Sequence, residues 1–415
     1  MPPVDRRQFL RAGALVGFQI VAGPAVHRGR CRLLAQPSVE VSTRAVDIVL
    51  GGTVIDMLGL LTLDWDKLFR WQRNPVSFLE TDFRALESAA VNIFHPAVET
   101  GAVDAWTGAR RWLQGWDALL ASQPCFLARI GSIHDLLQQP KMGKVGVLVG
   151  FQNSTHFRTT DDVAAFHDLG QQVSQLTYNG SNALGSGCRV ARDGGLTEFG
   201  TAVVAAMGEV GMAIDVSHCG ERTSIETIGA SRKPVLITHS NCRSLVPGQV
   251  RCKSDRVIRL MAAGGGVMGI TAVRAFVSSR GTATIDDWLD HFDHVARLVG
   301  VEHVGLGSDV DIDGLVPGTT QPNPTYAIRG LTHRVRVFQL ADGLLRRGYS
   351  NADVGLVLGH NFRRVLMQIW PDDSWSPVAE RETQRDPFCP AARPPDPLGR
   401  AGQEPTPRAL EPAPP

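Results

Sequence analysis

The sequence lacks an excess of charge of either sign. Its 42 Lys and Arg residues face 41 Asp and Glu residues, so the formal net charge at pH 7 is +1. This balance gives the chain no general field for holding nucleic acid or an anionic membrane surface, and neither partner is expected. There is also no run of 18 or more apolar residues beyond the N-terminus. A polytopic membrane protein is therefore excluded, and no membrane span is expected in the mature chain.

Cysteine is scarce as well. Seven cysteines in 415 residues are too few for a disulfide scaffold, and no CxxC pair suggests a zinc ribbon. Wholesale disorder is excluded because 43% of the residues are hydrophobic and only 20% are charged. These absences leave a soluble globular protein whose size suggests an enzyme.

The first segment has the features of an export signal. Arg6 and Arg7 begin the stretch Arg-Arg-Gln-Phe-Leu-Arg, a weakly apolar stretch follows over 12–22, and small residues come next. This order predicts a bacterial twin-arginine signal peptide over residues 1–25, the alternative being an arginine-rich, poorly ordered N-terminus. Twin-arginine export carries proteins that have already folded. We therefore expect the mature chain in the periplasm or secreted.

The other end of the chain also differs from the middle. Residues 371–415 contain 12 of the 25 prolines, few aliphatic residues and no apolar periodicity. This composition predicts a Pro-rich mobile tail, because the segment lacks side chains that could form a core. Between the two ends, residues 42–370 are predicted to form one domain.

Within this domain, short apolar β-branched runs alternate with helical patterns. Strands are predicted over 45–55, 145–150, 212–216, 235–237, 266–270 and 303–307. Helices are predicted over 161–175, 199–210, 254–263, 285–299, 334–347 and 351–369. Such alternation favours a parallel α/β architecture. At this length, and without a GxGxxG after the first strand, a closed (β/α)8 TIM barrel is preferred to an open doubly wound sheet.

Ligand-type side chains follow three of the predicted strands. His218 comes after the strand over 212–216, His239 after the strand over 235–237, and Asp309 after the strand over 303–307. Strand ends of a barrel meet at one face, where catalytic groups are found. Two imidazoles and a carboxylate there are what a divalent cation such as zinc requires. A single histidine at a strand end would more often be structural.

Seven sequence blocks follow one another along the chain: Gln175–Asn179, Gly195–Gly200, Ile214–His218, Thr238–Asn241, Asp290-His291, His303–Asp309 and Leu358–Arg364. In this order they resemble the renal or membrane dipeptidase family of zinc peptidases. The resemblance is dense over 171–364 and weak before it. It implies a metal-dependent-hydrolase (β/α)8 barrel, a dipeptide or related small amide as substrate, and zinc as cofactor. Homodimers are common in that family, although the sequence leaves the oligomeric state open.

The resemblance also implies roles for individual residues. In that family two zinc ions share a bridging glutamate, and the histidines of one ion correspond to His218 and His239. Asp309 corresponds to an aspartate that binds the other ion and handles protons. Tyr178 occupies the place of a histidine that contacts the reaction intermediate. Arg251 corresponds to an arginine that binds the substrate carboxylate.

The chain departs from the family pattern at the remaining metal ligands. The histidine and aspartate expected on the first strand are Leu58 and Leu60, and the bridging glutamate is Gln152. Asp56 shares the strand face of Leu58 and Leu60 but lies one step deeper in the barrel. Gln152 and Asp56 are therefore further candidate ligands, and a thiol from Cys219 or Cys242, each next to or near a proposed ligand histidine, is a lesser alternative. A neutral amide such as Gln152 cannot readily bridge two cations.

Charge decides between one metal ion and two. Two zinc ions carry four positive charges, whereas Asp309 contributes one negative charge and Asp56, if it reaches, a second. Two dications with so little compensation would be very unfavourable in a partly desolvated pocket. We therefore expect one zinc ion on His218 and His239, completed by Gln152, Asp309 or water. A site without metal is the alternative.

Three functions remain open at this point. The first is a zinc-dependent, dipeptidase-like hydrolase in which Asp309 and Tyr178 are catalytic and Arg251 and Tyr178 bind the substrate. The second is a family member recruited to a non-hydrolytic or maturation reaction on a peptide-derived metabolite. The third is a non-catalytic binding protein. The replacements at Leu58, Leu60 and Gln152 weaken the first function, and the retained histidines, aspartate and arginine weaken the third.

Overall fold

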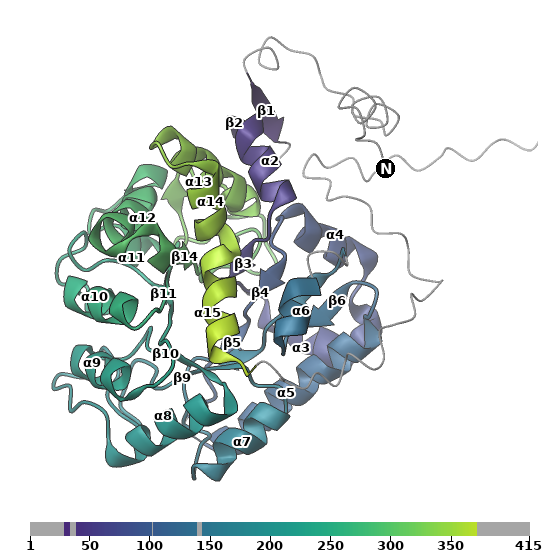
Figure 1. The fold of residues 1–415 in the computed structure, drawn as a ribbon. Coiled ribbons are helices and arrows are strands. Elements are labelled where there is room, and N and C mark those ends of the chain that lie inside the picture. The colour runs from purple at the N-terminus through teal and green to yellow at the C-terminus, as the bar shows by residue number, and fades with distance from the viewer. Residues whose placement is uncertain (1–28, 34–38, 102, 139–142, 372–415) are drawn as a thin grey trace, which may run out of the picture.

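The computed structural model of the chain describes residues 29–33, 39–101, 103–138 and 143–371. The predicted signal peptide over 1–25 lies outside the described residues. So does the predicted tail over 371–415, apart from its first residue. The described helices and strands run from Arg30 to Ile369 (Figure 1).

Parallel strands close into a barrel at the centre of the molecule. In spatial order they are β3 (Ile55–Asp56), β4 (Ile93–Phe94) with β5 (Ala97–Val98), β7 (Val145–Val147) with β8 (Gly150–Phe151), β9 (Val173–Gln175), β10 (Ala213–Asp215), β11 (Ile237–Ser240), β12 (Met268–Ile270) and β14 (Val304–Leu306). A single bridge from Asp215 to Leu236 joins β10 to β11, and the pairing of Leu306 with Asp56 returns β14 to β3. The chain therefore forms the (β/α)8 TIM barrel that the sequence predicts.

Two positions of the barrel wall are interrupted strands. His95 and Pro96 separate β4 from β5, where proline has no N–H to donate to a ladder. The neighbouring strand continues the pairing across this break, because the Gly150 amide donates to the Pro96 carbonyl at 3.2 Å. Outside the barrel, β6 (Leu127–Arg129) extends β7 in parallel. Two small additions are the antiparallel hairpin of β1 (Arg30–Leu33) with β2 (Val39–Ser42), and β13 (Ala283–Thr284) with β15 (Ile328–Arg329).

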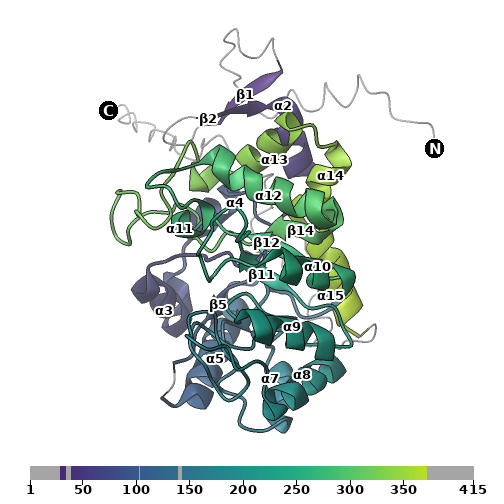
Figure 2. The same cartoon turned by 90° about the vertical axis from the view of Figure 1, so that its left-hand side faces the viewer.

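Helices surround the strands on all sides that Figures 1 and 2 show. They are α2 (Thr43–Gly51), α3 (Trp65–Arg73), α4 (Glu80–Ser88), α5 (Ala105–Ser122), α6 (Ile133–Gln138), α7 (Asp161–Asp168), α8 (Glu198–Val210), α9 (Glu221–Ala230), α10 (Asp255–Ala263), α11 (Arg274–Val277), α12 (Ile285–Val299), α13 (Arg336–Arg346), α14 (Asn351–Gly355) and α15 (Asn361–Ile369). Short 3-10 turns are η3 (Pro75–Ser77), η5 (Val301–His303) and η6 (His333–Val335), and the π-helical turn η7 (Leu356–His360) joins α14 to α15. In the described part of the chain, no helix is long and apolar enough to cross a membrane.

Polar side chains fix where many of these helices begin. Thr284 caps α12 by accepting from the Asp287 amide, and the Asp287 carboxylate accepts from the Thr284 amide in return. Such reciprocal capping satisfies donors that have no partner within the helix. Thr197 and Ser254 cap α8 and α10 in the simpler way, through the side-chain oxygen alone.

Two predicted elements differ from the structure. Residues 45–55 are predicted as a strand, but Ser42 caps the helix α2 there and the first barrel strand starts only at Ile55. The spacing of the aliphatic residues fits both the two-residue period of a strand and the 3.6-residue period of a helix. In the structure, Ala45 and Val49, four residues apart, form a buried helical face. The predicted helix over 161–175 ends at 168, because Gly170 has a left-handed φ of 93° and β9 follows.

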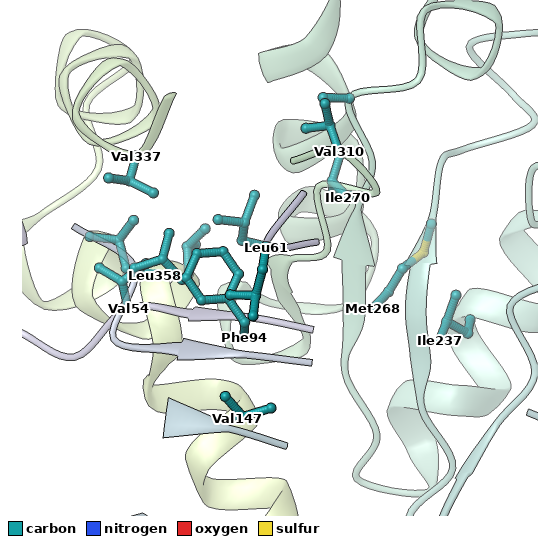
Figure 3. Close-up of a cluster of buried hydrophobic side chains, with 14 of the residues drawn as sticks. Val54, Leu61, Phe94, Val147, Ile237, Met268, Ile270, Val310, Val337 and Leu358 are labelled. Carbon is teal, nitrogen blue, oxygen red and sulfur yellow. The ribbon is translucent and has the colours of Figure 1, made fainter. Parts of the chain in front are cut away.

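Two apolar clusters fill the molecule. The larger lies between the strands and the surrounding helices, and Figure 3 shows Val337 of α13 and Leu358 of η7 near Val54, Leu61 and Phe94. The smaller cluster joins the amino ends of the barrel strands to α15. Its members include Ile55, Ile93, Val173, Ala213, Phe362 and Leu366. Helix α15 therefore closes the amino end of the barrel, which leaves the carboxyl end for the site.

Buried histidines predict that the fold is sensitive to acid. Burial lowers the pKa of His156, His291 and His333 from 6.5 to about 4. The unfolded chain binds these protons below pH 6.5 whereas the fold does not, so stability falls as pH drops from 6.5 to 4. Each histidine contributes up to about 3 kcal/mol of this loss. His156→Phe, within a cage of phenylalanines, should remove its share in urea unfolding at pH 7 and pH 4.

The exposed His134 offers the matched control for this measurement. His134→Phe should keep the pH dependence of the parent chain. An equally steep acid loss in the His156→Phe variant would contradict the assignment of that loss to the buried imidazole.

Candidate metal and catalytic site

Two imidazoles meet at the carboxyl end of the barrel. His218 follows β10 by three residues, and His239 lies within β11, the next strand. Their Nε2 atoms are 3.1 Å apart, and both side chains are buried, with 6% and 0% of their surface exposed. The structure thus brings together the two histidines that the sequence predicts as metal ligands.

Hydrogen bonds fix which nitrogen of each ring carries the proton. The Thr238 hydroxyl donates to the Asp215 carboxylate at 2.7 Å, so at 2.8 Å it can only accept from Nδ1–H of His239. His218 donates its Nδ1–H to the Asn179 side-chain oxygen at 3.0 Å. Both Nε2 atoms therefore carry lone pairs, and these lone pairs face each other.

Two lone pairs at this distance repel unless a cation lies between them. Burial, followed by the positive charge of Arg251, holds the pKa of His218 and of His239 well below the ordinary value. A proton shared by the pair is therefore disfavoured at neutral pH. Zinc–nitrogen bonds of about 2.0–2.1 Å in a tetrahedral site place two nitrogens about 3.3 Å apart, close to the observed separation. The pair fits two corners of a single metal site.

Arg251 connects the segments that carry the two histidines. Its Nη1 donates to the Ser217 carbonyl at 2.7 Å and its Nη2 donates to the His239 carbonyl at 2.8 Å. The side chain is 1% exposed, and its guanidinium lies 5.5 Å from the ring centre of Phe276. The guanidinium therefore holds together the two backbone segments that carry the histidines. Its expected contact with a substrate carboxylate stays a prediction.

Asp309 lies three residues after the end of β14 and is half-buried. Burial raises the pKa of the Asp309 carboxyl to about 7; the negative charge of Asp56 adds to the rise and Arg251 opposes it. Within the described part of the chain, this carboxyl group has no hydrogen-bond partner. A carboxyl group with such a pKa can both accept and donate a proton near neutral pH.

Two tyrosines complete this side of the site. The ring of Tyr178 stacks on His218 with centres 4.2 Å apart and planes 24° apart. Burial raises the pKa of the Tyr178 phenol, and the Asp309 charge raises it further. Burial and the Asp309 charge likewise raise the pKa of Tyr326. Sequence reasoning missed Tyr326 because it lies in the loop between β14 and β15, outside every recognised block.

The remaining candidate positions differ in what they offer a metal: Asp56 is engaged elsewhere, Gln152 is engaged through its amide nitrogen, and the two leucines are apolar. The Asp56 carboxylate accepts hydrogen bonds from Ser308 and Arg336 and is fully buried. The Gln152 amide nitrogen donates to the Ala97 carbonyl at 3.2 Å.

Leu58 and Leu60, which the sequence predicts on the first strand, lie in the segment directly after β3 and place buried hydrocarbon there. No three His, Cys, Asp or Glu side chains gather closely enough to hold a metal ion among the described residues. The side chains present fit one ion on the histidine pair and do not fit a two-ion centre.

The contact between Asn179 and His218 predicts a measurable effect on metal affinity. Asn179→Ala removes the acceptor that keeps the proton on Nδ1, and such supporting contacts are worth roughly 10–100-fold in affinity. We expect zinc affinity, measured by competition with a chromogenic chelator, to fall by that factor. Asn182→Ala is the matched control, because its side chain bonds only to the backbone of the same loop. Equal zinc affinity in the Asn179→Ala variant and the parent would contradict this assignment.

Known proteins with sequences similar to this chain include dipeptidases. A rat protein, Dipeptidase 3, is 29% identical over 233 residues, which is 54% of this chain and 45% of the rat protein. Dipeptidase aclJ of Aspergillus oryzae is 30% identical over 252 residues, which is 59% of this chain and 56% of the fungal protein. The chain thus spans about half the length of the curated relatives that it matches.

Solved structures share the fold over more of the chain. An amidohydrolase from Pseudomonas aeruginosa is 26% identical with a TM-score of 0.65, covering 79% of this chain and 99% of that one. A metallopeptidase from Rhodobacter sphaeroides, solved with a phosphinate mimic of the dipeptide L-Ala-D-Ala, has a TM-score of 0.62. It is 19% identical and covers 77% of this chain and 99% of that one, a likeness of fold alone.

A sequence profile of the membrane dipeptidases matches residues 85–371, more than half of the chain. The match includes both histidines, Asp309, Tyr178 and Arg251, and it agrees with the barrel and with the place of the site at its carboxyl end. The chain belongs to the membrane dipeptidase family, Peptidase family M19.

Proposed function

We propose that the protein is an exported metallohydrolase that hydrolyses a dipeptide or a related small amide with a single zinc ion. One observation carries this proposal: the Nε2 atoms of His218 and His239 face each other at 3.1 Å, and both have their lone pairs free. This buried pair of neutral donors suits a divalent cation far better than it suits a proton.

Each residue of the site would have its own role in hydrolysis. His218 and His239 would hold the ion, with Asp309, Gln152 or water completing its ligands. A bound zinc ion would lower the pKa of a water molecule and polarise the scissile carbonyl. Asp309, with a pKa of about 7, suits a group that takes a proton from the attacking water and returns it to the leaving amine. Tyr178, stacked on His218, can donate a hydrogen bond to the reacting group.

Relatives support the proposed substrate class. Two of them are named dipeptidases, and one structural neighbour holds a mimic of L-Ala-D-Ala. The experiment that tests the proposal is metal analysis of the purified protein beside hydrolysis of a panel of L–L and L–D dipeptides, with L-Ala-D-Ala included. One zinc ion per chain with turnover supports the proposal. Two ions per chain contradict the single-ion site.

A second candidate function rests on the altered first strand. Leu58 and Leu60 place hydrocarbon where the family pattern has metal ligands, and Gln152 is an amide. These changes favour a family member recruited to a different reaction on a peptide-derived metabolite. One ion per chain without hydrolysis of any dipeptide in the panel would select this function over the first.

Mutation of the ligands tests the centre directly. His218→Ala and His239→Ala should each abolish bound zinc and activity while the barrel stays folded, because each removes one of the two nitrogens proposed to hold the ion. Asp309→Asn should retain most of the zinc and lose roughly 10²–10⁴-fold in kcat, since an amide cannot accept the proton.

His294→Ala serves as the matched histidine control for these variants. Its ring bonds to Asp255 on the outer helices and should leave zinc content and kcat unchanged. Activity that survives in the His218→Ala variant would overturn the zinc-centred proposal.

Export is part of the proposal and rests on the sequence of residues 1–25. The twin-arginine pattern predicts delivery to the periplasm or the medium, where the protein would act as a monomer or a homodimer. Replacing Arg6 and Arg7 with lysines should leave the protein in the cytoplasm of a host with this export route, as cell fractionation would show. Normal accumulation in the periplasm would contradict the predicted signal.

A further inference from the structure

The backbone of Asp309 has an unusual conformation for a residue other than glycine. Its φ is 57°, and among the described residues only Ala90, Asp104 and Asp309 combine a side chain with a positive φ. L-residues populate this left-handed region rarely, although aspartate tolerates it better than most. The conformation persists only where neighbouring contacts hold it. The contacts on either side of Asp309 therefore decide where its carboxyl group points.

The residue before Asp309 is held by Asp56 on the first strand. The Ser308 amide donates to Asp56 Oδ1 at 2.8 Å, and the Ser308 hydroxyl donates to Oδ2 at 2.5 Å. The Asp309 amide itself donates to the Leu58 carbonyl at 2.7 Å, two residues after the end of β3. The start of the turn is thus fixed to β3 and to the turn that follows it.

The residues after Asp309 are held by Arg336 at the start of α13. Its Nη1 donates to the carbonyls of Asp311 at 2.8 Å and His333 at 3.1 Å. Its Nη2 donates to Asp56 Oδ2 at 3.2 Å, so one guanidinium spans the Asp56 carboxylate and the far side of the turn. Asp56 and Arg336 together therefore hold the turn on both sides of Asp309.

This ion pair is isolated from water. The side chains of Asp56 and Arg336 are 0% and 1% exposed. A dry pair with geometrically fixed donors resists rearrangement more than a solvated one. The pair also explains the fate of Asp56, because both of its oxygens already accept hydrogen bonds from protein donors. A residue that could resemble a spare metal ligand is instead part of the support of the turn.

We propose that Asp56, Ser308 and Arg336 form a positioning network that holds Asp309 in its left-handed conformation at the carboxyl end of the barrel. The network touches neither substrate nor metal and acts only through Asp309. This inference rests on the proposed function, in which Asp309 moves the proton during hydrolysis. It assigns to the buried pair a role in turnover that is separate from its role in folding.

The experiment compares two arginines of the same helix region in the zinc-loaded enzyme. Arg336→Lys keeps the charge and loses the fork that spans Asp56 and Asp311. Arg347→Lys makes the same change at the end of α13, where the arginine bonds to Asp290 and Asp293 of α12.

We expect Arg336→Lys to lower kcat about 10–100-fold on the best dipeptide of the panel, with KM and zinc content nearly unchanged, because small misplacements of a reacting group cost this much. Arg347→Lys should stay within about twofold of the parent in all three quantities. Ser308→Ala, which removes one hydroxyl, is the milder second variant if Arg336→Lys does not fold. It should lower kcat in the same direction.

A double-mutant cycle with Asp309→Asn separates positioning from general damage. If the network acts only through Asp309, then adding Arg336→Lys or Ser308→Ala to Asp309→Asn should cause no further loss of kcat. An equal fold-loss in both backgrounds, or an unchanged kcat in both single variants, would overturn the positioning role. An unaffected kcat in Asp309→Asn alone would instead overturn the proposed function, and would remove the network's effect on turnover with it.

Discussion

The site depends on how the carboxylate of Asp215 closes the barrel. Between β10 and β11 a single bridge pairs the strands. At this seam Asp215 accepts from the amide and hydroxyl of Ser217 on one side, and from the amide and hydroxyl of Thr238 on the other. A buried carboxylate that accepts four hydrogen bonds links the two segments strongly. Because His218 and His239 are the next residues after Ser217 and Thr238, the closure of the fold and the spacing of the imidazoles are set by one group.

The site is better understood as an altered centre than as a damaged one. Leucines at the first strand and an amide at Gln152 remove the charge that a second ion would need, and the Asp56 carboxylate is balanced by Arg336 instead. The charge of Asp56 is thus paired within the protein. What remains at the carboxyl end of the barrel is a pair of neutral imidazoles, the Asp309 carboxyl group with a pKa raised to about 7, and two phenols.

The sequence predicts those parts of the site that depend on local order. His218 and His239 lie at the ends of neighbouring strands, and the strands of a parallel barrel share a face, so the pattern of strands brings these two imidazoles together. Asp309 follows β14 at the same end of the barrel. The partner of Asp56 could not be predicted this way, because Arg336 is 280 residues away and lies on a helix whose rotation is set by packing. The orientation of the Arg251 side chain could not be predicted either, because a sequence motif does not show whether a guanidinium binds a ligand or the backbone. The predicted strand over 45–55 failed for a third reason: the aliphatic run fits both periods, and the cap at Ser42 decides for the helix.

The closure of the amino end of the barrel has a consequence for how the chain is made. Helix α15 supplies Phe362 and Leu366 to the cluster beneath the strands, and Asn361 donates to the carbonyls of Val301 and Val304. The strands that it covers are all translated earlier. A nascent chain that has not yet released residues 361–369 from the ribosome therefore exposes an apolar ring at the base of an unfinished barrel. Until then the exposed apolar surface favours aggregation and chaperone binding. Premature termination before α15 would leave this surface uncovered for good.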